Sequence, residues 1–88
     1  MAHQFNYSKN FKKHYKKLSV LERKQIIDKL KLLEKDPTHP SLRTKRIRAT
    51  TNLYESSVNM DIRIIWHYEA NGVITLLDVG HHDILKQF

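Results

Sequence analysis

The chain has 88 residues, of which 40% are hydrophobic and only two are Gly and two Pro, so we expect one small ordered domain spanning residues 1–88. It contains no cysteine, which excludes disulfides, thiolate metal sites and cysteine nucleophiles. No apolar run approaches the ~20 residues of a membrane span, and the N-terminus lacks a signal-peptide core, so we expect a cytoplasmic protein that does not bind a membrane.

The formal net charge of +7 is unevenly distributed along the chain. Residues 1–48 carry 14 Lys and Arg against four Asp and Glu, whereas residues 49–88 carry two against five. The first part is therefore strongly basic, which is typical of a protein that binds a polyanion, either nucleic acid or an acidic protein. A solvated, lysine-rich helix surface is the alternative explanation.

The N-terminal part predicts a first helix after a short extended segment. Ser8 is a suitable N-cap, and the apolar residues Phe11, Tyr15 and Leu18 recur with helical spacing, which places them on one face.

A second helix follows almost directly, so the two form an antiparallel hairpin. Ser19 and Glu22 in "SVLE" match a capping box that begins this helix. Its apolar stripe consists of Ile26, Ile27, Leu30 and Leu33. The helix must end at "DPTHP", because Pro37 and Pro40 cannot continue it.

From Leu42 onward the apolar period falls to two, which indicates strands. The candidates are "LRTKRIR", "LYESSV", "DIRIIWHY" and "VITLLDVG". Asn71-Gly72 in "EANG" predicts a hairpin turn between the last two. The expected fold class is α+β: an N-terminal helical hairpin packed on one face of a mostly antiparallel, twisted sheet of four or five strands, with the other face partly open.

Pairing across this hairpin sets even-numbered residues of "DIRIIWHY" against odd-numbered residues of "VITLLDVG". The face under the helices would then hold Ile62, Ile64, Trp66, Tyr68, Val73, Leu77 and Val79. The opposite face would hold Arg63, Ile65, His67, Ile74, Leu76, Asp78, Gly80 and, if the last strand continues, His82. We therefore expect Arg63 and His82 on the uncovered face and His81 facing the helices.

The order of these elements, the basic "LRTKRIR" strand, "RIIW" and the ending "LLDVGHHD" resemble the RelE/ParE superfamily of bacterial type II toxins over essentially the whole chain. The resemblance implies a RelE-like fold and a RelE/YafQ-like mRNA interferase. Such an enzyme is a metal-independent endoribonuclease that cleaves mRNA in the ribosomal A site, inhibits translation, uses no cofactor and is blocked by a cognate antitoxin in a hetero-oligomer. Two alternatives remain: a ParE-type DNA gyrase poison without nuclease activity, and a catalytically degenerate binding module.

The resemblance also implies roles for individual residues. Arg63 matches the strand arginine that holds the scissile phosphate, His82 lies where many members have a catalytic Arg or His, and His39 lies near an active-site histidine of the YafQ type. Three further residues match the family's basic segment that contacts the RNA backbone: Lys45, Arg46 and Arg48. The chain departs from the family at Lys86, where many relatives have a substrate-orienting tyrosine; Phe88 is the candidate to stack on a base instead.

RNA cleavage by an adjacent 2′-OH requires a general base, a general acid and a fixed cation at the phosphate. Arg63 suits the cation, since its planar fork matches two phosphate oxygens. The base stays open among His39, His67 and Glu55. Arg63 could instead form a surface ion pair with Asp78.

Metal binding is not expected at "HHD", because adjacent residues on a strand point in opposite directions and no spaced ligands accompany them.

Overall fold

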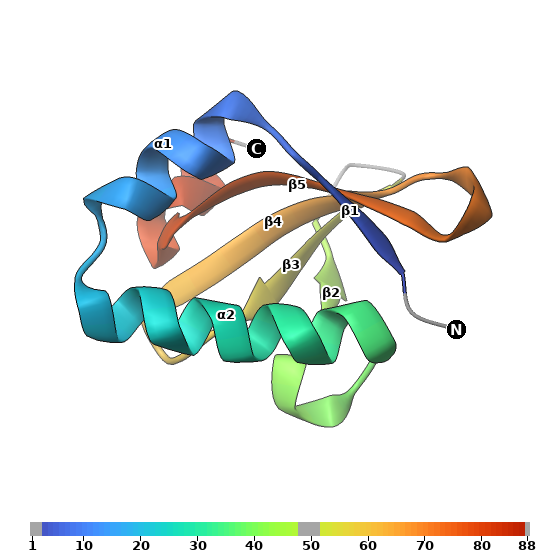
Figure 1. Ribbon diagram of the computed structural model, residues 1–88, viewed down its shortest axis with the longest axis horizontal. Helices are drawn as coiled ribbons and strands as arrows, with labels where there is room; N and C mark the ends of the chain where they lie inside the picture. Colours follow the sequence, from blue (N-terminus) through green and yellow to red (C-terminus); the bar gives the residue numbers. More distant parts are fainter. Residues whose placement is uncertain (1–2, 48–51, 88) are drawn as a thin grey trace.

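The computed structural model of this protein describes residues 3–47 and 52–87, and for residues 82, 86 and 87 it describes the backbone alone (Figure 1). The elements are, in chain order, β1 (Gln4–Tyr7), α1 (Lys9–Lys17), α2 (Val20–Lys35), the short 3₁₀ helix η1 (Pro40–Leu42), β2 (Lys45–Arg46), β3 (Leu53–Ser57), β4 (Ile62–Tyr68), η2 (Ala70–Gly72), β5 (Val73–His81) and η3 (His82–Gln87).

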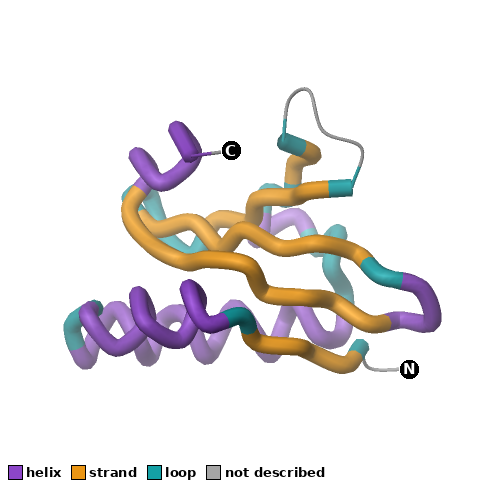
Figure 2. The backbone as a smooth tube through the Cα atoms, turned by 90° about the horizontal axis from the view of Figure 1, so that it is seen from above, coloured by secondary structure: helices purple, strands orange, loops and turns teal. Residues whose placement is uncertain are grey.

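The described strands form one five-stranded sheet in the order β1-β5-β4-β3-β2. β1 pairs in parallel with β5, and the other neighbours are antiparallel. The helices α1 and α2 lie on one side of the sheet and η3 on the other (Figure 2). The α+β fold expected from the sequence is therefore confirmed, with the extended N-terminal segment as the parallel fifth strand.

Both helices begin at the caps that the sequence predicts. The hydroxyl of Ser8 accepts a hydrogen bond from the Phe11 N–H at 3.0 Å. At the start of α2, Ser19 and Glu22 form the reciprocal capping box, with distances of 2.9 and 3.1 Å. These local bonds satisfy N–H groups that the first helical turn leaves unpaired, and each stabilises the helix by about 1 kcal/mol.

The core lies between the sheet and the two helices. Its buried members are Phe11, Ile26, Leu30, Leu33, Leu42, Val58, Ile62, Ile64, Trp66, Ile74, Leu76 and Val79. The stripe predicted for the second helix is wrong at Ile27, which is 42% exposed. One residue further along a helix turns a side chain by about 100°, so Ile27 cannot share the direction of Ile26.

A β-bulge between β4 and β5 contradicts part of the predicted face assignment. Ile65 pairs with Asp78, but the next residue, Trp66, pairs with Leu76, which leaves Leu77 without a partner in the register. An extra residue in one strand reverses which side chains point to which face. Ile74 and Leu76 are therefore fully buried in the core, in the place predicted for Val73 and Leu77, whereas Val79 lies in the core as predicted.

The first predicted strand is mostly wrong, because Leu42 belongs to η1 and β2 contains only Lys45 and Arg46. Arg43 adopts a left-handed backbone conformation (φ 48°), which interrupts an extended chain. The hairpin turn at "EANG" is confirmed: Asn71 and Gly72 both have positive φ, at 64° and 74°.

None of the helices in the described ranges has the length and apolar character that crossing a membrane requires.

Candidate nucleic-acid interface

The face of the sheet opposite α1 and α2, called the uncovered face although η3 lies on that side, carries an arginine and a glutamate side by side. In the register, Ser57 pairs with Arg63 and Glu55 pairs with Ile65, and residues that pair directly share a face. Glu55 Oε1 lies 3.9 Å from Arg63 Nε, and the two side chains are only 15% and 16% exposed. The structure thus places Glu55, whose face the sequence left open, beside Arg63.

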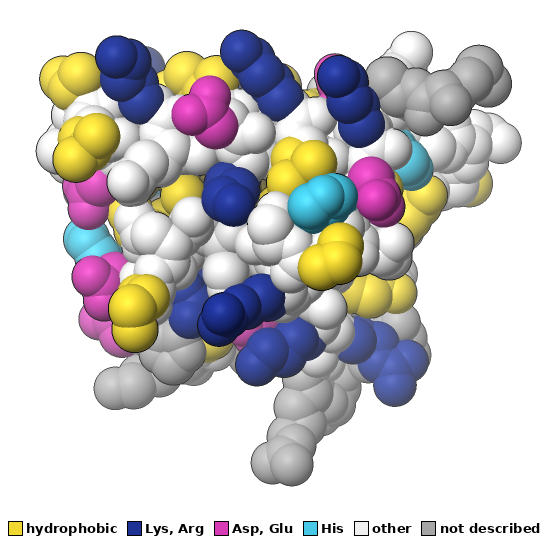
Figure 3. Space-filling model, turned by 90° about the horizontal axis from the view of Figure 1, so that it is seen from below, with side chains coloured by type: hydrophobic (Ala, Val, Ile, Leu, Met, Phe, Trp, Pro, Cys, Tyr) yellow, Lys and Arg dark blue, Asp and Glu magenta, His cyan; other side chains and the backbone are white. Residues whose placement is uncertain are grey.

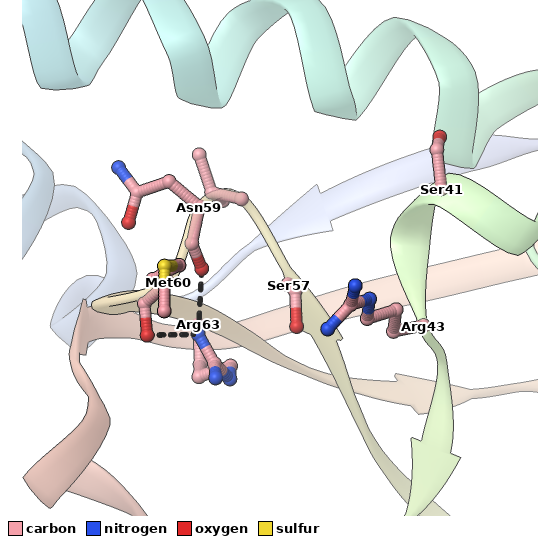
Figure 4. A pocket seen from close by; sticks show the side chains of 7 residues that line it. Ser41, Arg43, Ser57, Asn59, Met60 and Arg63 are labelled. Carbon is pink, nitrogen blue, oxygen red and sulfur yellow. Dashed lines mark hydrogen bonds between the residues drawn. The ribbon is translucent and has the colours of Figure 1, made fainter.

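Arg63 is held by backbone carbonyls of the β3–β4 turn. Its Nη1 donates to the carbonyl oxygens of Asn59 at 2.7 Å and Met60 at 3.1 Å, which Figure 4 shows, and also to that of Ile62 at 3.2 Å. Within the described residues its Nη2 makes no hydrogen bond. The proposed pairing of Arg63 with Asp78 is therefore wrong.

The turn itself is anchored to α2. Asn59 Oδ1 accepts from the N–H groups of Asp61 and Ile62, both at 2.8 Å, and Asn59 Nδ2 donates to Gln25 Oε1 at 2.8 Å. These bonds fix the carbonyls that in turn orient Arg63. The guanidinium is thus positioned before any ligand binds, which is the arrangement that electrostatic stabilisation of a phosphate requires.

The two residues of β2 point to opposite faces. Lys45 pairs with Glu55 and so shares the face of Arg63, whereas Arg46 pairs with Tyr54. Tyr54 stacks on Trp66 with ring centroids 4.6 Å apart, on the helix side. Lys45 and Arg46 are both exposed, but only Lys45 lies on the face of Arg63.

The histidines His39 and His67 lie apart from this pair. His39 begins η1, where its Nδ1 accepts from the Ser41 N–H at 3.1 Å. His67 Nε2 lies 2.6 Å from Asn52 Nδ2. Neither makes a hydrogen bond to Arg63 or Glu55 within residues 3–47 and 52–87.

The end of β5 differs from the expected continuous strand. The strand stops at His81, and His82 begins η3 on the side of the sheet away from α1 and α2. Ile84 of η3 packs closely against Gly80, where a Cβ would lie 2.7 Å from Ile84 Cγ2. His81 faces the helices as predicted, with Nε2 3.3 Å from Glu22 Oε2. Hydrogen bonds from Ser19 hold the pKa of Glu22 below its ordinary value of 4.5, and His81 adds to this effect.

Three of the predicted site features lie outside the described residues: the His82 side chain, Arg48 and Phe88. Among the described side chains, no group of three His, Asp or Glu residues could hold a metal ion.

Arg43 is the residue of this face that the sequence did not single out. It lines one pocket with Arg63 and Ser57, with a volume of about 290 Å³. Its place in the pocket depends on the positive φ after η1, and no sequence signal indicates a positive φ at an arginine.

No protein-family model and no curated protein sequence matches the chain. Solved structures do match it. The RelE–RelB complex from Pyrococcus horikoshii is 19% identical, with 92% of this chain and 96% of that chain covered at a TM-score of 0.77. The YoeB dimer from Staphylococcus aureus is 15% identical, with 93% and 99% covered and a TM-score of 0.77. The DinJ–YafQ toxin–antitoxin complex of E. coli is 14% identical, with 97% and 98% covered and a TM-score of 0.76.

The chain has the RelE fold. The coverage is nearly complete on both sides of each comparison, so the likeness extends over the helical hairpin and the sheet together. The RelE-like architecture expected from "RIIW" and "LLDVGHHD" is confirmed at this level. In the RelE fold of this chain, the Arg63–Glu55 pair lies on the face that α1 and α2 leave uncovered, because the alternate residues Ile62 and Ile64 are in the core.

Proposed function

We propose that the protein is the toxin of a type II toxin–antitoxin system and that it cleaves mRNA on the ribosome as a metal-independent endoribonuclease. The observation that carries this proposal is the preorganised Arg63 beside Glu55 on the uncovered face of a RelE fold. A cation fixed next to a carboxylate provides two of the three groups that cleavage by a 2′-OH needs.

In this proposal Arg63 binds the scissile phosphate through the edge of the guanidinium that the turn carbonyls leave open. Glu55 accepts the proton of the 2′-OH while the 2′ oxygen forms a bond to phosphorus. His82, where η3 begins, gives a proton to the 5′ oxygen as the P–O bond breaks. The products are a 2′,3′-cyclic phosphate and a 5′-hydroxyl end, so no water enters the first step.

The remaining residues would position the RNA. Lys45 shares the face of Arg63 and contacts the same stretch of backbone, whereas Arg46 and Arg48 contact phosphates further along the strand. Phe88 stacks on a base, and His39 lies in the neighbouring segment that precedes Arg43. Residues 1–88 act as one toxin domain.

A cognate antitoxin would bind this protein through opposite charge. Lys and Arg side chains are spread widely over the face of the molecule that is seen from below, with fewer acidic side chains among them (Figure 3). The net charge of +7 favours an acidic, amphipathic antitoxin segment that covers the RNA-binding side chains and forms a hetero-oligomer. The E. coli YafQ structure with this fold is a toxin–antitoxin complex with DinJ.

The test uses purified protein, programmed ribosomes and a defined mRNA, with primer extension to map cuts. We expect cuts inside the codon in the A site, and loss of cutting in Arg63→Ala and Glu55→Gln. A parallel assay measures gyrase supercoiling and DNA breakage. Gyrase poisoning with intact mRNA would assign the chain to the ParE type, and inactivity in both assays would leave a binding module.

A further inference from the structure

A pocket at one end of the uncovered face brings two arginines together without an acidic side chain among its lining residues. It has a volume of about 290 Å³, and its polar lining consists of Ser41, Arg43, Ser57, Asn59 and Arg63. In Figure 4, Arg43 extends from the segment after η1 towards Ser57, and Arg63 lies on the other side of Ser57. The pocket thus concentrates positive charge.

Arg43 points into the pocket because its backbone is held there. It has φ 48°, a conformation unfavourable for any residue with a Cβ, and its N–H donates to the Pro40 carbonyl at 3.1 Å. The next residue, Thr44, is fixed by hydrogen bonds of its hydroxyl to the Pro37 carbonyl at 2.7 Å and to the Ser56 hydroxyl at 2.8 Å. Strained backbone that the surroundings hold in this way is a feature of ligand sites.

Some donors of the pocket have no partner, whereas Asn59 Nδ2 donates to Gln25 and the Ser41 hydroxyl lies 3.0 Å from His39 Nδ1. Within the described residues, neither the Arg43 guanidinium nor the Ser57 hydroxyl makes a hydrogen bond or an ion pair, and Arg63 uses only Nη1 and Nε for its contacts. Two like charges that face one pocket repel each other unless an anion lies between them. A tetrahedral phosphate matches the planar donor forks of two arginines and a hydroxyl.

We propose that Arg43 is a second phosphate-binding residue and that the pocket holds an RNA phosphate between Arg43 and Arg63, with the Ser57 hydroxyl as a further donor. This inference rests on the proposed function for its ligand, since the phosphate is the one that Arg63 binds. Met60, which is 90% exposed at the rim, offers an apolar surface to the adjoining nucleotide. Arg43 thereby doubles the positive charge at the developing phosphorane.

The first experiment uses inorganic phosphate as the probe and requires no RNA. Thermal unfolding is measured with phosphate and with chloride at equal ionic strength. A ligand that binds the folded state alone raises the melting temperature with its concentration. We expect a phosphate-specific rise that Arg43→Ala and Ser57→Ala reduce and that Lys24→Ala, a charge-matched change on exposed α2, leaves intact. An equal loss in Lys24→Ala, or no phosphate-specific rise in the wild type, overturns the proposal.

The second experiment measures cleavage of ribosome-bound mRNA. Loss of a charged hydrogen bond predicts a rate about 10- to 100-fold lower in Arg43→Ala, with partial recovery in Arg43→Lys. If the wild type cuts mRNA and Arg43→Ala cuts equally fast, the second phosphate contact is wrong and the proposed function stands. If the wild type cuts no mRNA but phosphate still stabilises it through Arg43, the pocket is a phosphate site and the proposed function is wrong.

Discussion

His14 on α1 and Asp78 on β5 lie 64 positions apart in the chain, yet His14 Nδ1 and Asp78 Oδ1 are 2.5 Å apart. Asp78 is only 1% exposed, and its Oδ1 also accepts from the Val79 N–H at 2.8 Å. The bulge at Leu77 changes the direction of the side chains around it, which is a common effect of β-bulges. The hydrogen bond joins α1 to β5, beyond the point where β1 stops pairing.

Removal of His14 should therefore destabilise the protein. His14→Ala leaves the buried Asp78 carboxyl group with a single hydrogen-bond donor, and we expect a loss of about 1–3 kcal/mol in the free energy of unfolding. Urea denaturation measures this loss. As a control, Asp28→Ala on the exposed side of α2 should stay within about 0.5 kcal/mol of wild type. Equal stability of the two variants would show that the His14–Asp78 contact contributes little.

A larger residue in place of Gly80 should destabilise the protein. A Cβ at this position would lie 2.7 Å from Ile84 Cγ2, so Gly80→Ala forces η3 away from the sheet. Overpacking of this kind costs about 1–3 kcal/mol. The double variant Gly80→Ala/Ile84→Ala should recover part of the loss, as measured by thermal unfolding, because the clashing side chain is gone. A double variant that is less stable than Gly80→Ala would contradict this packing.

Stability should depend on pH through Glu22. Its pKa in the folded state is lowered, first by hydrogen bonds from Ser19, so the unfolded state binds more protons as the pH falls below 4.5. The stabilisation is complete above that range and is lost as the pH falls through the folded-state pKa. Glu22→Gln keeps a capping-box residue but cannot titrate, so melting temperatures between about pH 3 and pH 6 should vary less than in wild type. Glu34→Gln, outside the capping box, serves as the control.

The salt dependence of RNA binding should separate the two residues of β2. Each phosphate contact contributes about 0.7 to the slope of log affinity against log salt for a single strand. Lys45→Ala and Arg46→Ala should both lower this slope, but only Lys45→Ala should also slow cleavage, because Lys45 shares the face of Arg63. Unchanged slopes in a salt titration would indicate that β2 is merely a solvated edge.

His82→Ala should reduce the cleavage rate by about 10²-fold or more, as expected for loss of a general acid. His81→Ala should instead act on stability, since His81 contacts Glu22 on the helix side. Single-turnover cleavage and thermal unfolding of both variants distinguish these effects. Wild-type cleavage by His82→Ala would remove this residue from the proposed mechanism.

Local interactions allowed the sequence to predict much of this fold. The caps at Ser8 and Ser19 and the positive φ angles at Asn71 and Gly72 depend on residues within four positions of one another. The alternation in "DIRIIWHY" also correctly placed Arg63 on the face opposite the helices, since β4 itself is regular. The resemblance to RelE-like toxins could likewise be stated from the order of elements together with "LRTKRIR", "RIIW" and "LLDVGHHD".

Tertiary structure decided the features that depend on distant parts of the chain. The extra residue at Leu77 reversed the faces of Ile74 and Leu76, and alternation within one strand contains no information about a bulge. The partners of Asp78 and Glu55 come from other elements, at His14 and Arg63, so no spacing in the sequence could reveal them. What the sequence determined is the two helices with their N-caps and the hairpin of β4 and β5, because short-range hydrogen bonds and periodicity specify them. How the side chains meet on the uncovered face was decided by packing in three dimensions. A shift of one residue in the pairing of two strands changes the cross-strand neighbours of every side chain.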